Sequence, residues 1–414
     1  MSDEAVSITV DHLFRHEYGK MVAVLSRGFG FDRLSLAEDL VQETLIAAMH
    51  SWSVNGLPDN PAAWLMTVAK NKARNQLKHE GRKGRIHGQM QVEERDDRSP
   101  QVFFDSDIAD SQLRLMFGCC HPDIARSDQL ALILKTLGGF GVGEIARALL
   151  LGEEAVAKRI YRAKHRISDR KIALDVPGGP ELDARVDAVH QALYLLFNEG
   201  YSPSESEEVI RRDLCDEAIR LCGLMTERFG EHRGGWALHA LMNFHAARFD
   251  SRIGDGGAVV LFADQSRATW DRSLIERGMI SLSRSASGEV LTAFHIEASI
   301  AAQHCIAPSM DATNWAFIRQ LYERLMVLKP SPLIKLNLGI VTLMIEGPRA
   351  AIIQVETLRE DRKLKKHPLL WATLGSLYAH LDQTDAARRA YAKAGALSES
   401  PRERLVLSGR IATL

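Results

Sequence analysis

The sequence predicts an all-α fold that is divided into several domains. Apolar residues recur at three- and four-residue spacing through most of the chain, which is the period of a helix with one buried face. Glycine and proline interrupt this pattern at a few places, most clearly at residues 176–180. The chain has 414 residues, which exceeds the usual size of one domain, so two to four domains are expected.

The N-terminal composition and the cysteine spacing indicate the compartment of the protein and whether a metal ion is expected. The N-terminal segment is polar and acidic, and no run of about 18 apolar residues follows, so neither a secretory signal nor a membrane span is expected. The five cysteines are odd in number and show no CxxC spacing, which indicates a reduced, cytoplasmic setting. The adjacent Cys119 and Cys120 are poorly placed to share one tetrahedral ion. We therefore expect a buried structural role for them, and no metal ion or cofactor.

Three helices are expected at the N-terminal end. The first carries an apolar stripe over residues 10–25. The second begins near Ser35, a candidate N-cap, with Glu38 three residues on in the pattern of a capping box. Asn-Gly and Pro between His50 and Pro61 predict a loop, and the third helix follows it.

The second of these helices presents an acidic face. Its polar residues one helical turn apart are Glu38, Asp39, Gln42 and Glu43. An acidic helical face suits a basic protein partner, and the alternative is an ordinary solvated surface.

The third helix presents a basic face that also carries asparagine and tryptophan. Basic residues neutralise phosphates, Asn reads base edges, and aromatic rings support unstacked bases. The residues concerned are Trp64, Lys70, Asn71, Arg74, Asn75 and Lys78. The alternative is a solvated charged face with Trp64 in the core.

In order and spacing, these two helices resemble domain 2 of the extracytoplasmic-function sigma factors. The resemblance rests on Ala37-Glu-Asp-Leu-Val-Gln-Glu-Thr44, the loop, and an Ala-Trp-Leu segment with spaced Ala and Asn residues, and it covers residues 8–85. It implies that the acidic face binds the β′ subunit of RNA polymerase core. It also implies that the basic face binds the −10 promoter element, with residues 51–60 holding a flipped base.

Residues 143–167 form a second DNA-binding candidate. Two short helices with a tight turn and a basic second helix predict a helix-turn-helix. Its candidate DNA contacts are Ala155, Lys158, Arg159, Arg162, Lys164 and Arg166. The alternative is a basic helical hairpin that binds nothing. The segment resembles domain 4 of the same sigma family, which recognises the −35 element in the major groove.

These observations give a domain plan. We expect a sigma domain 2 helical bundle at residues 1–90, a linker at 91–110, sigma domain 4 at 111–175, a helical extension at 181–290 and tetratricopeptide-like helical repeats at 291–414. Such a layout resembles a subgroup of the sigma family in which the tail replaces a separate anti-sigma protein as the regulator.

The repeat prediction rests on large and small residues near the C-terminal end. Trp371, Gly375, Tyr378, Ala387 and Tyr391 fall on the tetratricopeptide spacing, and a weaker copy lies upstream. Repeats of this kind usually present a concave surface to a protein partner, and the alternative is an ordinary helical bundle. Between the sigma-like part and the repeats, the polar-aromatic segment 264–270 is a candidate loop site.

The predicted function is promoter-specific initiation of transcription. The predicted partners are RNA polymerase core, through its β′ and β subunits, promoter DNA, and a protein bound by the repeats; no membrane is expected. The alternative is a helix-turn-helix regulator that acts without polymerase core and senses a ligand or a protein through its helical domain, although such a regulator has no use for the acidic helix. An enzyme is not expected, because no dinucleotide fingerprint, P-loop, HExxH or nucleophile elbow occurs.

Overall fold

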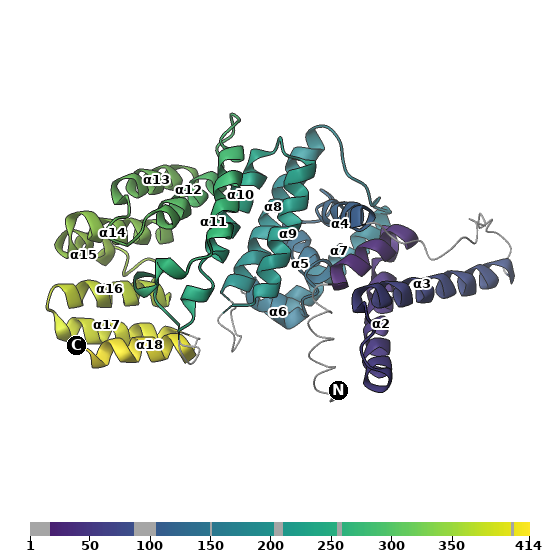
Figure 1. The fold of residues 1–414 in the computed structure, drawn as a ribbon, viewed down its shortest axis with the longest axis horizontal. Helices are drawn as coiled ribbons and strands as arrows, with labels where there is room; N and C mark the ends of the chain where they lie inside the picture. Colours follow the sequence, from purple (N-terminus) through teal and green to yellow (C-terminus); the bar gives the residue numbers. More distant parts are fainter. Residues whose placement is uncertain (1–16, 87–104, 150, 203–209, 255–258, 399–400) are drawn as a thin grey trace. The chain divides into compact units, whose positions relative to one another are not determined.

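The computed structural model describes residues 17–86, 105–149, 151–202, 210–254, 259–398 and 401–414. Over these residues the fold is all-α, as predicted, and extended pairing is confined to one isolated bridge between Ile253 and Val259. The chain divides into two compact units, Met1–Phe197 with Arg212–Met225, and Asn198–Arg211 with Thr226–Leu414. They are called unit 1 and unit 2, and Figure 1 labels their helices. None of the helices in the described residues is long and apolar enough to cross a membrane.

The described part of unit 1 starts with a helix at residues 17–29, followed by η1 (Phe31–Arg33) and α2 (Leu34–Asn55). The predicted N-cap at Ser35 is wrong, because η1 runs directly into α2 and no side chain caps that helix. The predicted loop is shorter than expected, because the first residue with a helix-breaking conformation is Gly56, at a φ of 78°.

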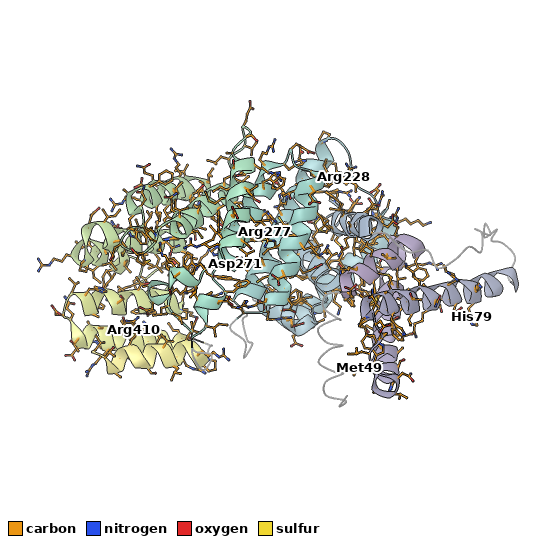
Figure 2. The ribbon with its side chains drawn as sticks, in the orientation of Figure 1. Met49, His79, Arg228, Asp271, Arg277 and Arg410 are labelled. Carbon is orange, nitrogen blue, oxygen red and sulfur yellow. The ribbon has the colours of Figure 1, made fainter. Side chains whose placement is uncertain are left out.

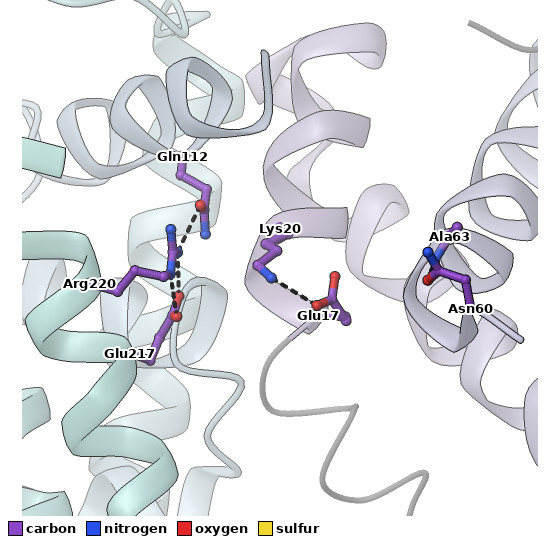
Figure 3. A network of polar contacts seen from close by, with 7 residues as sticks. All are labelled: Glu17, Lys20, Asn60, Ala63, Gln112, Glu217 and Arg220. Carbon is purple, nitrogen blue, oxygen red and sulfur yellow. Dashed lines mark hydrogen bonds and ion pairs between the residues drawn. The ribbon is translucent and has the colours of Figure 1, made fainter. Parts of the chain in front are cut away.

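The next helix of unit 1, α3 (Pro61–Ile86), starts at a proline as such helices often do. Asn60 precedes it, and its side-chain oxygen accepts a hydrogen bond from the backbone N–H of Ala63 at 3.0 Å (Figure 3). This cap supplies one of the acceptors that the first turn of a helix requires. The chain therefore enters α3 in a fixed direction from the loop 56–60.

Four further helices of unit 1 contain the second DNA-binding candidate and the residues directly before it. They are α4 (Asp105–Cys119), α5 (Arg126–Thr136), α6 (Val142–Ala148) and α7 (Glu153–Arg170). Residues 105–110 of the predicted linker belong to α4, so that part of the linker prediction is wrong; residues 91–104 lie outside the described residues. The N-terminal helix packs closely on this group, since a Cβ on Gly19 would lie 2.4 Å from the carbonyl oxygen of Leu137.

Unit 1 does not end at the predicted break near residues 176–180. The helical pattern is interrupted there, but α8 (Pro180–Tyr201) and α9 (Arg212–Arg228) contribute most of their length to the same compact unit. Arg220 on α9 donates to the side-chain oxygen of Gln112 on α4 at 2.9 Å, and it pairs with Glu217 (Figure 3). Buried polar contacts of this kind bind the start of the extension to α4.

Unit 2 continues with α10 (Arg233–Ala246), the short turns η2 (Asp250–Arg252), η4 (Phe262–Asp264) and η5 (Arg267–Thr269), and then α11 (Arg272–Ser285) and α12 (Ala293–Ile306). Asp271 caps α11 by accepting from the backbone N–H groups of Ser273 and Leu274 at 2.8 and 3.1 Å. These bonds to Leu274 and Ser273 lower the pKa of the Asp271 carboxyl. Figure 2 labels Asp271 at the start of this helix.

The rest of unit 2 consists of helices that follow one another closely. They are α13 (Trp315–Leu328), α14 (Pro332–Glu346), α15 (Pro348–Glu356), α16 (Pro368–His380), α17 (Thr384–Leu397) and α18 (Pro401–Ala412). A Cβ on Gly339 would lie 2.5 Å from the side chain of Val355, and one on Gly375 would lie 2.7 Å from the ring of Tyr391. The same number of residues separates the two glycines as separates their two partners. The pairs α14–α15 and α16–α17 therefore touch through equivalent small residues.

Candidate functional site

The acidic face predicted on α2 is mostly present. Asp39, Gln42 and Glu43 are exposed, while the apolar face of the same helix is buried in unit 1. Glu43 accepts a hydrogen bond from Lys72 of α3 at 3.0 Å, in an ion pair that solvent reaches. Three of the four predicted protein-binding residues are thus available on one open helical surface.

Glu38 departs from the prediction. It is only 3% exposed, and one carboxylate oxygen accepts a hydrogen bond from the ammonium group of Lys164 on α7. Its other carboxylate oxygen is buried without a hydrogen-bond partner among the described residues. The expectation that Glu38 lies on an exposed polar face is therefore corrected, because α7 packs over it and supplies an opposite charge.

The basic face of α3 is open to solvent. Asn71, Arg74, Asn75 and Lys78 are all exposed. Lys70 is half-buried, and burial, opposed by the carboxylate of Asp107, lowers the pKa of its ammonium group to about 8. Four of the six predicted residues are therefore exposed on one surface of α3, and Lys70 and Trp64 are half-buried.

The tryptophan predicted to support DNA bases is half-buried. The ring centroid of Trp64 lies 5.4 Å from that of Trp52 on α2, with the ring planes 62° apart. Trp52 is fully buried, and edge-to-face pairs of this kind are favourable. The two rings therefore pack α2 against α3, a structural role that the sequence pattern did not reveal, and Trp64 is partly exposed.

Residues of α7 predicted to contact DNA fall into two groups. Ala155, Lys158 and Arg166 are exposed, and Lys158 pairs with Glu154 one turn earlier at 2.6 Å. The apolar residues Val156 and Ile160 hold this helix against the rest of the unit. The first turns of α7 therefore present an open surface.

The second group on α7 makes contacts within unit 1, with the Arg162 side chain remaining 57% exposed. Arg162 donates two hydrogen bonds to the buried carboxylate of Asp128 on α5, at 3.0 and 2.8 Å, and this carboxylate raises the pKa of the guanidinium group. Arg159 donates to the backbone oxygen of Ser127 at 3.4 Å. The ammonium group of Lys164 forms an ion pair with the carboxylate of Glu38. The prediction that Lys164 lies on an open DNA-facing surface is wrong for this arrangement, since its side chain is directed at α2.

The cysteines near the end of α4 have the buried role expected of them. Cys119 and Cys120 are fully buried, and the Cys119 sulfur lies 3.6 Å from the hydroxyl oxygen of Thr136. Burial raises the pKa of the Cys119 thiol to about 12. No group of three or more potential metal ligands occurs in the described part of the chain.

The five residues predicted to pack the C-terminal repeat are brought together on α16 and α17. Trp371, Gly375, Ala387 and Tyr391 are buried, and Gly375 lies against the ring of Tyr391. Tyr378 is half-buried, and its hydroxyl group donates to the Glu356 carboxylate of α15. These contacts join the α16–α17 pair to the helix before it.

Comparison with known proteins agrees with this geometry. Residues 13–83 match Sigma-70 region 2, the part of those factors that interacts with RNA polymerase core and promoter DNA, and residues 185–286 match a family of unknown function (DUF6596). An uncharacterized protein of Rhizobium meliloti (strain 1021) is 35% identical over 376 residues, which are 90% of this chain and 88% of that protein. No solved structure matches the chain. The chain therefore belongs to the same family as the Rhizobium meliloti protein, and its residues 13–83 are similar to Sigma-70 region 2.

Proposed function

We propose that the protein is a sigma factor of the extracytoplasmic-function type, which binds RNA polymerase core and directs initiation at promoters with paired −35 and −10 elements. One observation carries the proposal. The exposed acidic face of α2 and the exposed basic face of α3 are on adjacent helices, joined by the short loop 56–60, within the segment that matches Sigma-70 region 2. The acidic face binds the β′ subunit, and the basic face binds DNA.

The basic face of α3 acts by electrostatics and by hydrogen bonding. Arg74 and Lys78 displace counterions from phosphates, which gives affinity. Asn71 and Asn75 supply amide groups that read base edges. A base that leaves the stack at the −10 element is held by the loop next to Trp64, which offsets part of the few kcal/mol that unstacking costs. No covalent chemistry, metal ion or cofactor is required, and the protein works in the cytoplasm with the polymerase.

For the −35 element we assign α6 and α7 as a helix-turn-helix. The buried faces of the two helices pack together, and the first turns of α7 present Ala155 and Lys158 to solvent. The N-terminal residues of a recognition helix are the ones that reach base edges. Arg166 lies further along the same helix and contacts phosphate. Arg159 and Arg162 join this set once their contacts with Ser127 and Asp128 are released.

Retention of DNA fragments separates this proposal from the regulator alternative. The full chain is mixed with genomic DNA fragments, with and without polymerase core, at fixed salt. A sigma factor retains specific fragments only with core, because its acidic face must bind the enzyme first. A helix-turn-helix regulator retains the same specific fragments without core, typically at paired half-sites, and that result would exclude the proposal.

The helical extension is the proposed regulatory part, with α14–α18 as tetratricopeptide-like repeats that bind a protein. Support comes from the equivalent glycine contacts of α14–α15 and α16–α17, because small residues at such contacts define this repeat. A chain that ends at Arg228 keeps the whole of unit 1, including the contacts of Arg220 on α9. If that chain initiates just as the full chain does under all conditions tested, the extension is not a regulator.

A further inference from the structure

The region between α10 and α11 holds arginines against aromatic rings, and all of these residues lie in unit 2. The guanidinium carbon of Arg248 lies 4.2 Å from the centre of the Phe262 ring and 5.4 Å from that of Trp270. Arg252 lies over Tyr201 at 3.8 Å. Cations are attracted to the faces of aromatic rings, so the rings hold both guanidinium groups in place. Trp270 ends the polar-aromatic segment that the sequence marked as a candidate loop site.

A third arginine in this region has a structural role. Arg267 is buried, and one of its nitrogens donates to the carbonyl oxygens of His304 and Ala307 at 3.0 and 2.9 Å. A second nitrogen, Nη2, donates to the hydroxyl group of Thr313 at 3.0 Å. The two carbonyls lie at the C-terminal end of α12, where a cation offsets the helix dipole. Both terminal nitrogens of Arg267 therefore make hydrogen bonds inside the protein.

Arg248 and Arg252 keep donor atoms that the described residues do not use. Two nitrogens of Arg248, Nε and Nη2, donate to the side-chain oxygen of Gln265 at 3.1 and 3.0 Å. Nη1 of Arg252 donates to the carbonyl oxygen of Tyr201 at 2.5 Å. Nη1 of Arg248, together with Nε and Nη2 of Arg252, has no hydrogen-bond partner among the described residues. Two arginines thus offer three nitrogens with N–H groups to a ligand.

The positive charge of this cluster has no acidic counterpart in the described part of the chain, where no ion pair involves Arg248 or Arg252. Burial lowers the pKa of Arg248, and the nearby Arg252 and Arg267 lower it further. Burial and the same arginines lower the pKa values of His245 and His304 to about 3, so both rings are neutral at neutral pH. Half-buried charges held together without an opposite charge are costly, and an anion would offset that cost.

From this geometry we infer that Arg248 and Arg252 form a binding site for an oxyanion, namely a phosphate or carboxylate group carried by a small molecule. Guanidinium groups match the planar and tetrahedral oxygens of such groups with parallel N–H donors. A nucleic-acid backbone fits the site less well, because Asp250 and Asp264 are exposed close by in the sequence and their carboxylates repel a polyanion. The site lies in the extension, and its existence does not depend on the proposed sigma activity.

Calorimetric titration of the full chain tests the site with three probes: inorganic phosphate, pyrophosphate and citrate, at constant ionic strength. Saturable binding of at least one probe is expected, and the preferred probe tells phosphate from carboxylate. Arg252→Gln should weaken that binding by about tenfold or more, because charged hydrogen bonds are lost. Arg349→Gln removes the same charge from an exposed position on α15 and should leave binding unchanged. No binding of any probe, or equal loss in both variants, overturns the inference.

A second variant keeps the test decisive if Arg252→Gln does not fold, which circular dichroism would show. Gln265→Glu is nearly isosteric, and it places a carboxylate where Gln265 already accepts two hydrogen bonds from Arg248. The internal carboxylate should compete with the probe and weaken its binding by about tenfold. It also removes the donor that Gln265 gives to the carbonyl oxygen of Val260 at 3.0 Å, so folding is checked in the same way. Binding as tight as in the unmodified chain overturns the inference.

Discussion

Lys164 of α7 donates a hydrogen bond to the buried carboxylate of Glu38 on α2, so a residue predicted to read DNA is paired with a residue predicted to bind polymerase. The Glu38 side chain is 4% exposed and that of Lys164 is 23% exposed. While this pair is made, Glu38 is covered, and the ammonium group of Lys164 is directed at Glu38. The pair therefore joins α2, which carries the acidic face, to α7 of the helix-turn-helix candidate, and it occupies one predicted residue of each.

Removing the ammonium group of this pair is expected to destabilise the protein. Lys164→Met leaves the Glu38 carboxylate buried without an opposite charge, and the free energy of unfolding should fall by about 3 kcal/mol. The double variant Glu38→Gln, Lys164→Met should recover most of this loss, because neither partner then carries a charge. Urea denaturation, monitored by circular dichroism, measures the free energy of unfolding of the single and the double variant. The matched control is Lys158→Met, whose exposed pair with Glu154 on the same helix should change stability by no more than about 0.5 kcal/mol. Equal effects of Lys164→Met and Lys158→Met would contradict the buried pair.

The exposed acidic residues of α2 are expected to determine affinity for polymerase core. Asp39→Asn together with Glu43→Gln should weaken core binding by about tenfold at low salt, and by less as salt screens the attraction. Fluorescence anisotropy of the labelled chain titrated with core measures this. Glu227→Gln with Glu276→Gln removes the same charge from exposed positions on α9 and α11 and should leave the affinity unchanged; a similar loss there would attribute the effect to net charge alone.

Lys70 is expected to make DNA binding depend on pH. Its pKa is lowered from 10.5 to about 8 by burial, so it is charged at pH 7 and mostly neutral at pH 9. The advantage of the unmodified chain over Lys70→Gln in holoenzyme binding to promoter DNA should therefore shrink as pH rises through 8. At pH 7 the logarithm of the binding constant should fall less steeply with the logarithm of the salt concentration in Lys70→Gln, with a slope smaller in magnitude by about 1. Lys70→Arg should keep the advantage at both pH values, and an advantage that is constant from pH 7 to 9 in the unmodified chain would contradict the proposed contact.

The lowered pKa of Lys70 also makes the stability of the protein depend on pH. Between pH 8 and 10.5 the unfolded chain binds a proton at Lys70 that the folded chain has lost. Stability rises with pH wherever the unfolded state binds more protons. The contribution of Lys70 to the free energy of unfolding should therefore increase over this window, and it should be absent from Lys70→Met.

Gly375 is expected to be intolerant of a methyl group. A Cβ there would lie 2.7 to 2.9 Å from three atoms of the Tyr391 ring, so Gly375→Ala should lower the free energy of unfolding by about 1–3 kcal/mol. Gly395→Ala, on α17 where a Cβ would meet nothing within 4 Å, should instead raise it by up to about 1 kcal/mol. Thermal unfolding compares the stability of both variants with that of the unmodified chain. A Gly375→Ala protein as stable as Gly395→Ala would show that α16 and α17 do not touch there.

Local features of this fold could be predicted from the sequence because they depend on neighbouring residues. The helical period identified α2, α3 and α7, and their exposed residues Asp39, Arg74 and Lys158 lie on the predicted faces. The small residues at Gly375 and Ala387 likewise indicated a tight helix pair. Periodicity reports which side of a helix is polar, and that information is carried by residues three and four positions apart.

Long-range pairing could not be predicted in the same way. Glu38 and Lys164 are 126 positions apart, and each has the charge of an ordinary surface residue until the other covers it. Arg220 binds Gln112 across 108 positions, so the compact unit continues past the break at residues 176–180, which a local glycine and proline pattern does not indicate. Likewise, the roles of Arg248 and Arg252 depend on rings from Tyr201 and Phe262, which helical periodicity does not bring together.

Mapping of RNA 5′ ends tests the central claim most directly. Polymerase core transcribes fragmented genomic DNA with the full chain, without it, and with the variant Asn71→Ala, Arg74→Ala. We predict new start sites with the full chain that share two upstream elements about two helical turns apart, and loss of these starts with the α3 variant but not with Arg349→Gln. No new start sites, either with the full chain or with the chain that ends at Arg228, would contradict the account.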